Sequence, residues 1–295
     1  MKTSSNLVRD CRRHYASELE KIYDSNEANA LIMILLEHYF NIDRVKIAME
    51  PELRLSESEL LTLHFAVKEL LKNKPIQYII GETEFCGMRF MVEDGVLIPR
   101  PETEEMVRSI AGDYRKTKNT RNSKLSIIDI GTGSGCIAIS LAKLLKDSTV
   151  TAVDVSEKAL EIAKKNAEAN DVNVNFIKDD ILNPKNQELI DNQYDIIVSN
   201  PPYVCESEKN EMRANVLDYE PSAALFVSDN DPLIFYRKIL EFAQTHLKTN
   251  GEIWFEINEK FGEEMKNLCL EKGFKNVEII KDFRERDRIV KIKRM

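Results

Sequence analysis

The stretch that decides the fold is Ile127-Ile128-Asp129-Ile130-Gly131-Thr132-Gly133-Ser134-Gly135, in which an apolar run leads directly into three closely spaced glycines. Glycine accepts backbone conformations that other residues avoid, and it lets a ligand approach the main chain closely. The segment therefore predicts a sharp turn at the exit of a strand, with a nucleotide-like cofactor bound against it. A dinucleotide fingerprint would need glycine at Cys136, and a P-loop would need Gly-Lys-Ser/Thr, so both of those interpretations are weakened.

Strands and helices alternate from this turn to the end of the chain. Apolar runs predict strands at Ser126 to Ile130, Thr149 to Val153, Val174 to Ile177, Asp195 to Ser199, Glu252 to Ile257, Val277 to Ile280 and Ile289 to Ile292. Helical spacing follows the first two strands, as far as Leu145 and Asn170. Such alternation predicts a Rossmann-like α/β fold, with a mostly parallel seven-stranded sheet that is covered by helices on both faces.

The N-terminal part of the chain has a different pattern. Apolar residues recur at helical spacing from Ser4 to Leu71, a capping box begins at Ser56, and Pro75 marks the end of the last helix. Short β-prone runs punctuated by glycine follow, beginning with Gln77 to Ile80 and ending with Gly95 to Ile98. We expect a small helical bundle domain over residues 1–75, a β-hairpin linker over 76–98 and a catalytic domain over 99–295.

Composition limits the possible functions. The 295 residues carry a formal net charge of -8, which argues against a protein that grips DNA through its phosphates. The five cysteines include no C-x-x-C pair, so we expect neither a metal site nor a disulfide framework. No apolar run approaches the length of a membrane span. We therefore expect a soluble cytoplasmic protein without direct DNA or membrane contact. A monomer is expected as well, although composition does not determine the oligomeric state.

Two acidic positions follow later strands of the predicted sheet. Asp154 ends the second strand, from where a carboxylate can accept hydrogen bonds from both hydroxyls of a ribose. Asp180 follows the third strand and is placed to meet an adenine, with Ile181 packing beside the base. A glycine-rich turn or an Asp after a strand is often only a turn or a helix cap. In this order and spacing they resemble the cofactor motifs of the class I S-adenosylmethionine-dependent methyltransferases.

The segment Asn200-Pro201-Pro202-Tyr203 directly follows the fourth strand, at the end of a sheet where such folds bind ligands. An amide or aromatic amine nitrogen is a poor nucleophile, so its methylation depends mainly on positioning. The side-chain carbonyl of Asn200 and a main-chain carbonyl near the prolines can accept both N–H groups of a planar –NH2. The two prolines keep this backbone rigid, and Tyr203 can stack on the acceptor.

A plain proline-rich turn, with Tyr203 packing on the core, is the alternative interpretation of this tetrapeptide. Its place after the glycine turn and the two acidic positions favours the catalytic one. None of the histidines falls in this region, since three lie in the helical domain and His246 lies near a later turn. No general base is evident, and the proton can leave after methyl transfer.

With these motifs in place, the chain resembles the release factor glutamine methyltransferase family (PrmC, also called HemK) over nearly its whole length. The segments that carry the match are Gln77 to Glu104, Asp129 to Ala142, Ser199 to Val204 and Tyr219 to Leu225. The most specific is Ile98-Pro99-Arg100-Pro101-Glu102-Thr103-Glu104, because tetrapeptides like Asn-Pro-Pro-Tyr also occur in DNA adenine methyltransferases.

The resemblance implies methyl transfer from S-adenosyl-L-methionine, with S-adenosyl-L-homocysteine as product, to the N5 nitrogen of the glutamine in the Gly-Gly-Gln motif of class 1 peptide chain release factors. It implies that the helical domain helps to hold the release factor. By motif matching, the cofactor site would comprise Gly131, Thr132, Gly133, Ser134, Gly135, Asp154, Asp180, Ile181 and Asn200. The catalytic and glutamine-binding residues would be Asn200, Pro201, Pro202 and Tyr203.

Three further positions each have two interpretations. Phe90, Arg100 and Pro101 either wall the pocket or serve in hairpin packing and an interdomain salt bridge. Many relatives carry a glycine pair where this chain has Val227 to Pro232, and others carry glycine at the position of Glu285, which puts in doubt one loop and the last β-hairpin. The rival functions are a DNA amino methyltransferase, a ribosomal-protein glutamine methyltransferase and a catalytically silent cofactor-binding module.

Overall fold

The computed structural model describes residues 5–116 and 124–294, and the chain forms two compact units. The first comprises Met1–Gly81 and Arg213–Tyr219, and the second comprises Glu82–Met212 and Glu220–Met295. These bounds differ from the predicted division at residues 75 and 98. The helical part continues to Gly81, and a short segment from the C-terminal half of the chain joins it.

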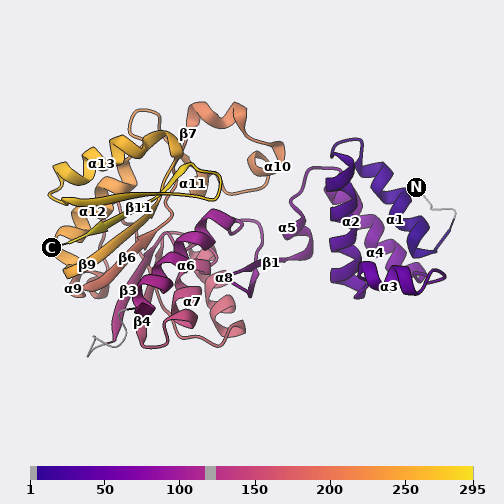
Figure 1. Ribbon diagram of the computed structural model, residues 1–295, viewed down its shortest axis with the longest axis horizontal. Helices are drawn as coiled ribbons and strands as arrows, with labels where there is room; N and C mark the ends of the chain where they lie inside the picture. Colours follow the sequence, from indigo (N-terminus) through magenta and orange to yellow (C-terminus); the bar gives the residue numbers. More distant parts are fainter. Residues whose placement is uncertain (1–4, 117–123, 295) are drawn as a thin grey trace. The chain divides into compact units, whose positions relative to one another are not determined.

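The first unit is helical (Figure 1). Its helices are α1 (Val8–Leu19), α2 (Ser25–Phe40), α3 (Arg44–Met49), α4 (Glu57–Leu70), α5 (Ile76–Ile80) and α10 (Ala214–Leu217). The predicted capping box is present, because the Ser56 hydroxyl accepts from Glu59 N and the Glu59 carboxylate accepts from Ser56 N at 2.7 Å. Fully buried Leu19, Ile32 and Leu63 form the centre of its core.

The predicted strand over Gln77 to Ile80 is wrong, since these residues belong to helix α5. Gly81 adopts a left-handed conformation (φ 80°) and closes the helix by donating its N–H to Gln77 O at 2.8 Å. Ile76, Ile79 and Ile80 pack against the helical core. Their spacing places them on one face of a helix, whereas in a strand they would point to opposite faces. The hairpin lies just beyond, as β1 (Glu82–Phe85) and β2 (Met88–Met91), and Gly95 to Ile98 is not a strand.

The second unit is built on a seven-stranded sheet with the order β10-β11-β9-β6-β3-β4-β5. Its strands are β3 (Leu125–Ile130), β4 (Ser148–Asp154), β5 (Asn175–Lys178), β6 (Tyr194–Ser199), β9 (Leu247–Glu256), β10 (Asn276–Lys281) and β11 (Asp287–Lys293). Pairing is parallel from β5 to β9, and β11 is antiparallel to both of its neighbours. The seven strands predicted for this sheet and its mostly parallel pairing are confirmed.

Helices cover both faces of this sheet (Figure 1). The remaining helices are α6 (Pro101–Lys116), α7 (Cys136–Leu144), α8 (Glu157–Ala169), α9 (Gln187–Asp191), α11 (Ser222–Leu225), α12 (Ile234–His246) and α13 (Gly262–Glu271), with 3₁₀ turns at Glu206–Glu211 and Glu259–Phe261. Successive strand residues point to opposite faces, so Ile127 joins the core under α6 and α7, whereas Ile128 joins the core under α12 and α13.

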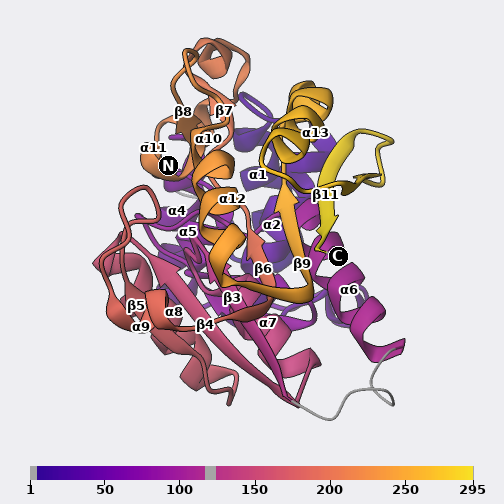
Figure 2. The same cartoon turned by 90° about the vertical axis from the view of Figure 1, so that its left-hand side faces the viewer.

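The direction of strand order reverses between β3 and β6, which run side by side in the middle of the sheet (Figure 2). From β3 the chain proceeds outward to β4 and β5, and from β6 it proceeds the other way to β9. Open α/β sheets bind ligands outside the carboxyl ends of their strands at such a reversal. Strand β7 (Val204–Cys205) follows shortly after the end of β6 and pairs in parallel with β8 (Phe226–Val227).

Candidate active site

The glycine turn after β3 forms one wall of a cavity at the carboxyl ends of the strands. Gly131 and Gly133 have φ angles of 77° and 55°, and a Cβ at either would meet no atom within 4 Å. Gly131 N and Thr132 N both donate to Val153 O, at 2.8 and 3.0 Å. The main chain therefore lines open space here, as close approach of a ligand requires.

Gly135 lies in a packed environment, unlike Gly131 and Gly133. Its φ is 82°, and a Cβ there would lie 2.8 Å from Ile139 Cδ1 and 3.0 Å from the Ala163 Cβ. The third glycine thus permits α7 and α8 to pack closely. Thr132 and Ser134 are buried, and the Thr132 hydroxyl donates to Asp129 at 2.6 Å. Among the predicted cofactor residues of the turn, only Gly131 and Gly133 line the cavity.

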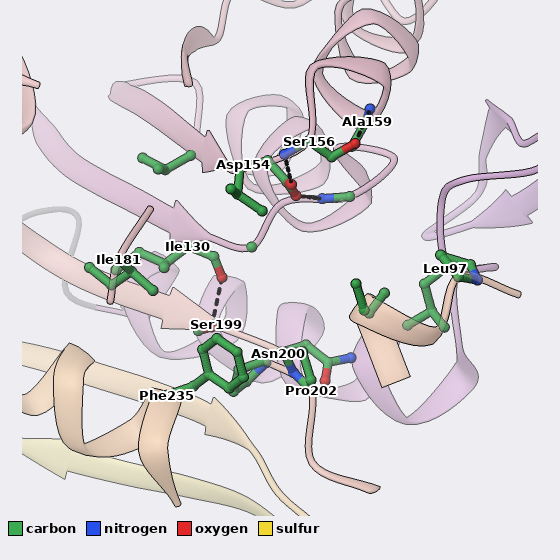
Figure 3. A pocket seen from close by; sticks show the side chains of 18 of the residues that line it. Leu97, Ile130, Asp154, Ser156, Ala159, Ile181, Ser199, Asn200, Pro202 and Phe235 are labelled. Atoms are coloured by element: carbon green, nitrogen blue, oxygen red, sulfur yellow. Dashed lines mark hydrogen bonds between the residues drawn. The ribbon is translucent and has the colours of Figure 1, made fainter. Parts of the chain in front are cut away.

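Asp154 ends β4 and faces this cavity (Figure 3). Its carboxylate accepts Gly133 N at 2.8 Å and Ser156 N at 2.9 Å, so it fixes the glycine turn as well as the start of α8. Burial raises the pKa of Asp154 above its ordinary value, while the backbone hydrogen bonds lower it. A carboxylate has about four acceptor sites, so acceptor capacity remains for the hydroxyl groups of a ribose.

Beyond β5 the cavity is lined by Asp179, Asp180 and Ile181. Asp179 accepts the main-chain N–H groups of Lys185 and Asn186 at 2.9 Å, and therefore shapes the loop rather than facing a ligand freely. Asp180 is exposed, while Ile181 is 9% exposed and belongs to the core. This polar and apolar pair suits the edge and the face of a planar base, so the residues present fit an adenosyl cofactor.

Asn200 and Pro202 line the side of the cavity opposite Asp154 (Figure 3), and Pro201 lines the same cavity. They follow β6 directly, and Ser199 anchors that strand end by donating its hydroxyl to Ile130 O at 2.6 Å. The Asn200 Nδ2 donates to Thr103 Oγ1 at 3.1 Å. No residue in the described part of the chain donates to Asn200 Oδ1, so this oxygen is available to accept a hydrogen bond from a ligand.

Tyr203 does not line the cavity, although the sequence predicts that its ring stacks on the acceptor. Its ring packs against the core, its hydroxyl donates to Glu256 Oε1 at 3.0 Å, and its carbonyl accepts from Asn258 Nδ2 at 3.2 Å. Burial raises the pKa of Tyr203 well above its ordinary value, so the phenol remains a donor. Stacking on the acceptor stays a prediction.

Sequence reasoning missed Glu256, which is 1% exposed at the end of β9. Its carboxylate accepts from the Thr103 hydroxyl at 2.6 Å and from Tyr203. Burial raises the pKa of Glu256, while these two hydrogen bonds and the charge of Arg288 lower it. A carboxylate at the end of the apolar run Ile253 to Ile257 was the available signal, because a buried acid needs partners.

The segment before α6 approaches the cavity through Gly95, Val96 and Leu97. Phe90, Arg100 and Pro101 do not line it. Phe90 is fully buried and packs edge-on against Phe85, with ring centroids 5.9 Å apart. Pro101 begins α6.

Arg100 forms an ion pair with Glu220 at 2.6 Å. Both residues belong to the second unit, so this pair is not an interdomain salt bridge.

At Val227 to Pro232 and at Glu285, where many relatives carry glycine, local hydrogen bonds hold the main chain. In the loop after β8, Asp229 accepts from the Ser207 hydroxyl at 2.6 Å and Asp231 accepts from Arg237 at 2.7 Å. Glu285 occupies a left-handed conformation, φ 62°, in the turn between β10 and β11. That turn forms because the Asp282 carboxylate accepts the N–H groups of Arg284 and Arg286, at 2.8 and 3.1 Å.

Two features are absent from residues 5–116 and 124–294. Within those ranges no group of three or more His, Cys, Asp or Glu side chains is arranged to hold a metal ion. Over the same ranges, no helix combines the length and apolar character that crossing a membrane requires.

Two family models match the chain. The PrmC N-terminal domain matches residues 10–81, and the Methyltransferase small domain matches residues 116–219. The chain is 46% identical to the release factor glutamine methyltransferase of Flavobacterium psychrophilum, covering 97% of this chain and 99% of that protein. It is 45% identical to the protein of the same name from Bacteroides thetaiotaomicron, over 92% of this chain and 95% of that one.

Solved structures of lower similarity share the fold. A methyltransferase from Pyrococcus furiosus superimposes with a TM-score of 0.50 at 23% identity, over 77% of this chain and 96% of that one. A 16S rRNA methyltransferase from Thermus thermophilus, solved with S-adenosylmethionine and guanosine, gives 0.50 at 18% identity, over 72% of this chain and 50% of that one. With the strand order, these confirm the predicted class I S-adenosylmethionine-dependent methyltransferase fold and its N-terminal helical domain.

Proposed function

Since the chain belongs to the release factor glutamine methyltransferase family, we propose that it methylates the N5 side-chain nitrogen of the glutamine in the Gly-Gly-Gln motif of class 1 peptide chain release factors. S-adenosyl-L-methionine is the methyl donor and S-adenosyl-L-homocysteine the product. The enzyme works as a monomer in the cytoplasm, in support of translation termination, without binding DNA. The helical unit contributes to holding the release factor.

The cofactor supplies an electrophilic methyl group on a sulfonium. The chain's own residues do the rest by positioning. Gly131 and Gly133 leave room for the cofactor against the main chain, and Asp154 and Asp180 offer carboxylates to its polar groups. Ile181 provides an apolar surface for the base.

The observation that carries the proposal is the hydrogen bonding of the Asn200 side-chain amide. Its Nδ2 is committed to Thr103, and its Oδ1 accepts from no described residue, at the wall of the cavity opposite Asp154. An acceptor amide that donates one N–H to this oxygen, in the plane of the amide, leaves a face of its nitrogen open toward the cofactor side of the cavity. Pro201 and Pro202 hold the main chain rigid beside it, so little freedom is lost when the acceptor binds.

The proposal is tested with radiolabelled S-adenosylmethionine and three acceptors offered separately: a class 1 release factor, a ribosomal protein and duplex DNA. We expect label in the release factor alone. Asn200→Ala should lose turnover and keep cofactor affinity, while the exposed control Asn192→Ala should retain both. Equal labelling of DNA, or full turnover by Asn200→Ala, would contradict the proposal.

A further inference from the structure

Four side chains form a continuous hydrogen-bonded chain behind the cavity wall. Asn200 Nδ2 donates to Thr103 Oγ1 at 3.1 Å, Thr103 Oγ1 donates to Glu256 Oε2 at 2.6 Å, and the Tyr203 hydroxyl donates to Glu256 Oε1 at 3.0 Å. Thr103 and Glu256 are 2% and 1% exposed, so water does not compete for these bonds. These hydrogen bonds join the ends of β6 and β9 to the first turn of α6.

The proton in each of these hydrogen bonds can be assigned to its donor. A threonine hydroxyl has a single proton, and the short contact places it on the path to Glu256. Thr103 therefore offers only lone pairs to its other neighbour. An asparagine amide has a donor end and an acceptor end of nearly the same shape, and only the donor end can meet a lone pair. The Asn200 oxygen must then turn away from Thr103.

We propose that Thr103 and Glu256 are positioning residues that lock the Asn200 amide with its Oδ1 directed at the acceptor nitrogen. This inference rests on the proposed function. Glu256 fixes the direction of the Thr103 proton, because a carboxylate that accepts from both Thr103 and Tyr203 has no proton to return. Tyr203 takes part by holding the second carboxylate oxygen.

The reversed amide shows what the lock prevents. If Thr103 Oγ1 received a proton from residue 256, its own proton could turn to Asn200 Oδ1, and the amide could rotate with its NH2 group toward the cavity. An NH2 group there would face the N–H groups of the acceptor, donor against donor. Glu256→Gln makes this state possible, because a glutamine must present its own NH2 to one of the two hydroxyls.

The substitutions that separate these roles are nearly isosteric. Thr103→Val removes the hydroxyl and keeps the shape, Thr103→Ser returns the hydroxyl, and Glu256→Gln keeps the volume while adding a donor. Thr149→Val is the matched control, because Thr149 is exposed near the start of β4 and its hydroxyl donates only a 3.3 Å bond to Leu125 O. Thermal unfolding of each variant reports whether it folds.

Two readouts are needed, and one of them requires no substrate. The side-chain amide resonance of Asn200 in ¹⁵N-labelled protein should shift in Thr103→Val and in Glu256→Gln, and remain near its original position in Thr103→Ser. Turnover on the release factor should fall about 10- to 100-fold in Thr103→Val and Glu256→Gln, as misplacement of a reacting group does. Cofactor affinity should stay unchanged, Thr103→Ser should restore most of the turnover, and Thr149→Val should match the unsubstituted chain.

An unshifted Asn200 resonance in Thr103→Val would overturn the proposal. It would also be overturned if Thr103→Ser were as impaired as Thr103→Val, or if lost turnover merely followed lost thermal stability. Failure of the proposed function looks different. The unsubstituted chain would then leave the release factor unmethylated, while the Asn200 resonance would still respond to Thr103→Val.

Discussion

Arg100 Nη2 donates to Glu220 Oε1 at 2.6 Å, and Glu220 Oε2 also accepts from Ile98 N at 3.2 Å. One buried carboxylate thereby joins the segment before α6 to the segment that follows Tyr219. Both segments reach the cavity, through Leu97 on one side and Pro221 on the other. The segment Ile98 to Glu104 thus holds the cavity wall in place through the ion pair of Arg100 with Glu220, although Arg100 itself does not line the cavity.

The first prediction concerns this ion pair. Arg100→Met should reduce the free energy of unfolding of the second unit by about 3 kcal/mol, because it leaves the Glu220 side chain, 1% exposed, without its cation. Arg108→Met is the matched control and should cost less than about 1 kcal/mol, since its ion pair with Glu104 lies at the surface. The sole tryptophan, Trp254, is buried in the second unit, so its fluorescence during urea unfolding reports this unit. Equal losses in the two variants would contradict the assignment.

The second prediction concerns packing at the glycine turn. Gly135→Ala should destabilise the second unit by at least about 1 kcal/mol more than Gly87→Ala, because overpacking adds to the backbone strain. Both glycines have left-handed backbones, φ 82° and 75°, but only at Gly135 would a Cβ contact other atoms. The same fluorescence-monitored unfolding measures the difference. If both variants lost the same stability, close packing of α7 on α8 would not be the reason for glycine at this position.

A third prediction concerns cofactor affinity. Asp154→Ala should weaken binding of S-adenosylmethionine about 10- to 100-fold, the usual effect of losing hydrogen bonds to a charged group. It also releases Gly133 N, which Asp154 holds at 2.8 Å. Asp180→Ala should cost less, because Asp180 is exposed and its hydrogen bonds compete with water. Isothermal titration calorimetry compares the two, and a larger loss in Asp180→Ala would reverse the assignment.

A fourth prediction follows from Asp129, which is fully buried at the end of β3. Burial raises the pKa of Asp129 to about 7. In the unfolded chain the same group has a pKa of about 3.9. Between these values the folded state holds the proton more strongly, so this group's contribution to stability falls as pH rises from about 4 to about 7.

Asp129→Asn should remove that fall and flatten the stability profile across this window. An asparagine can place its single side-chain oxygen at the position of Oδ2, to which Thr132 and Ala138 both donate. Urea unfolding at several pH values between 4 and 8 makes the comparison. An unchanged slope in the variant would show that Asp129 does not titrate in this range.

The sequence predicted the parts of the molecule that local patterns determine. The apolar run before Gly131 and the position of Asp154 after a strand led to the sheet, the turn and the cavity, since a strand end places its next residues at a known edge. Gln77 to Ile80 is predicted as a strand because its residues are β-prone. It is helical because Ile76, Ile79 and Ile80 have helical spacing and pack together against the core of the first unit, which the local sequence does not reveal.

Relationships across long separations were beyond sequence patterns. Thr103 and Glu256 are 153 residues apart, and nothing local to either indicates the other. The same holds for the segment Arg213–Tyr219, which joins the helical unit and in which the Tyr219 hydroxyl donates to Lys72 O at 3.0 Å. Only tertiary packing brings such residues together, and the buried Glu256 carboxylate then takes the partners that burial demands.

The most direct test of the central claim is peptide mass spectrometry of a class 1 release factor after incubation with this protein and S-adenosylmethionine. The account predicts the added mass of one methyl group on the glutamine of the Gly-Gly-Gln motif, complete with the unsubstituted chain and absent with Asn200→Ala. A methyl group on any other residue, or an unmodified glutamine beside a cofactor-saturated enzyme, would contradict it.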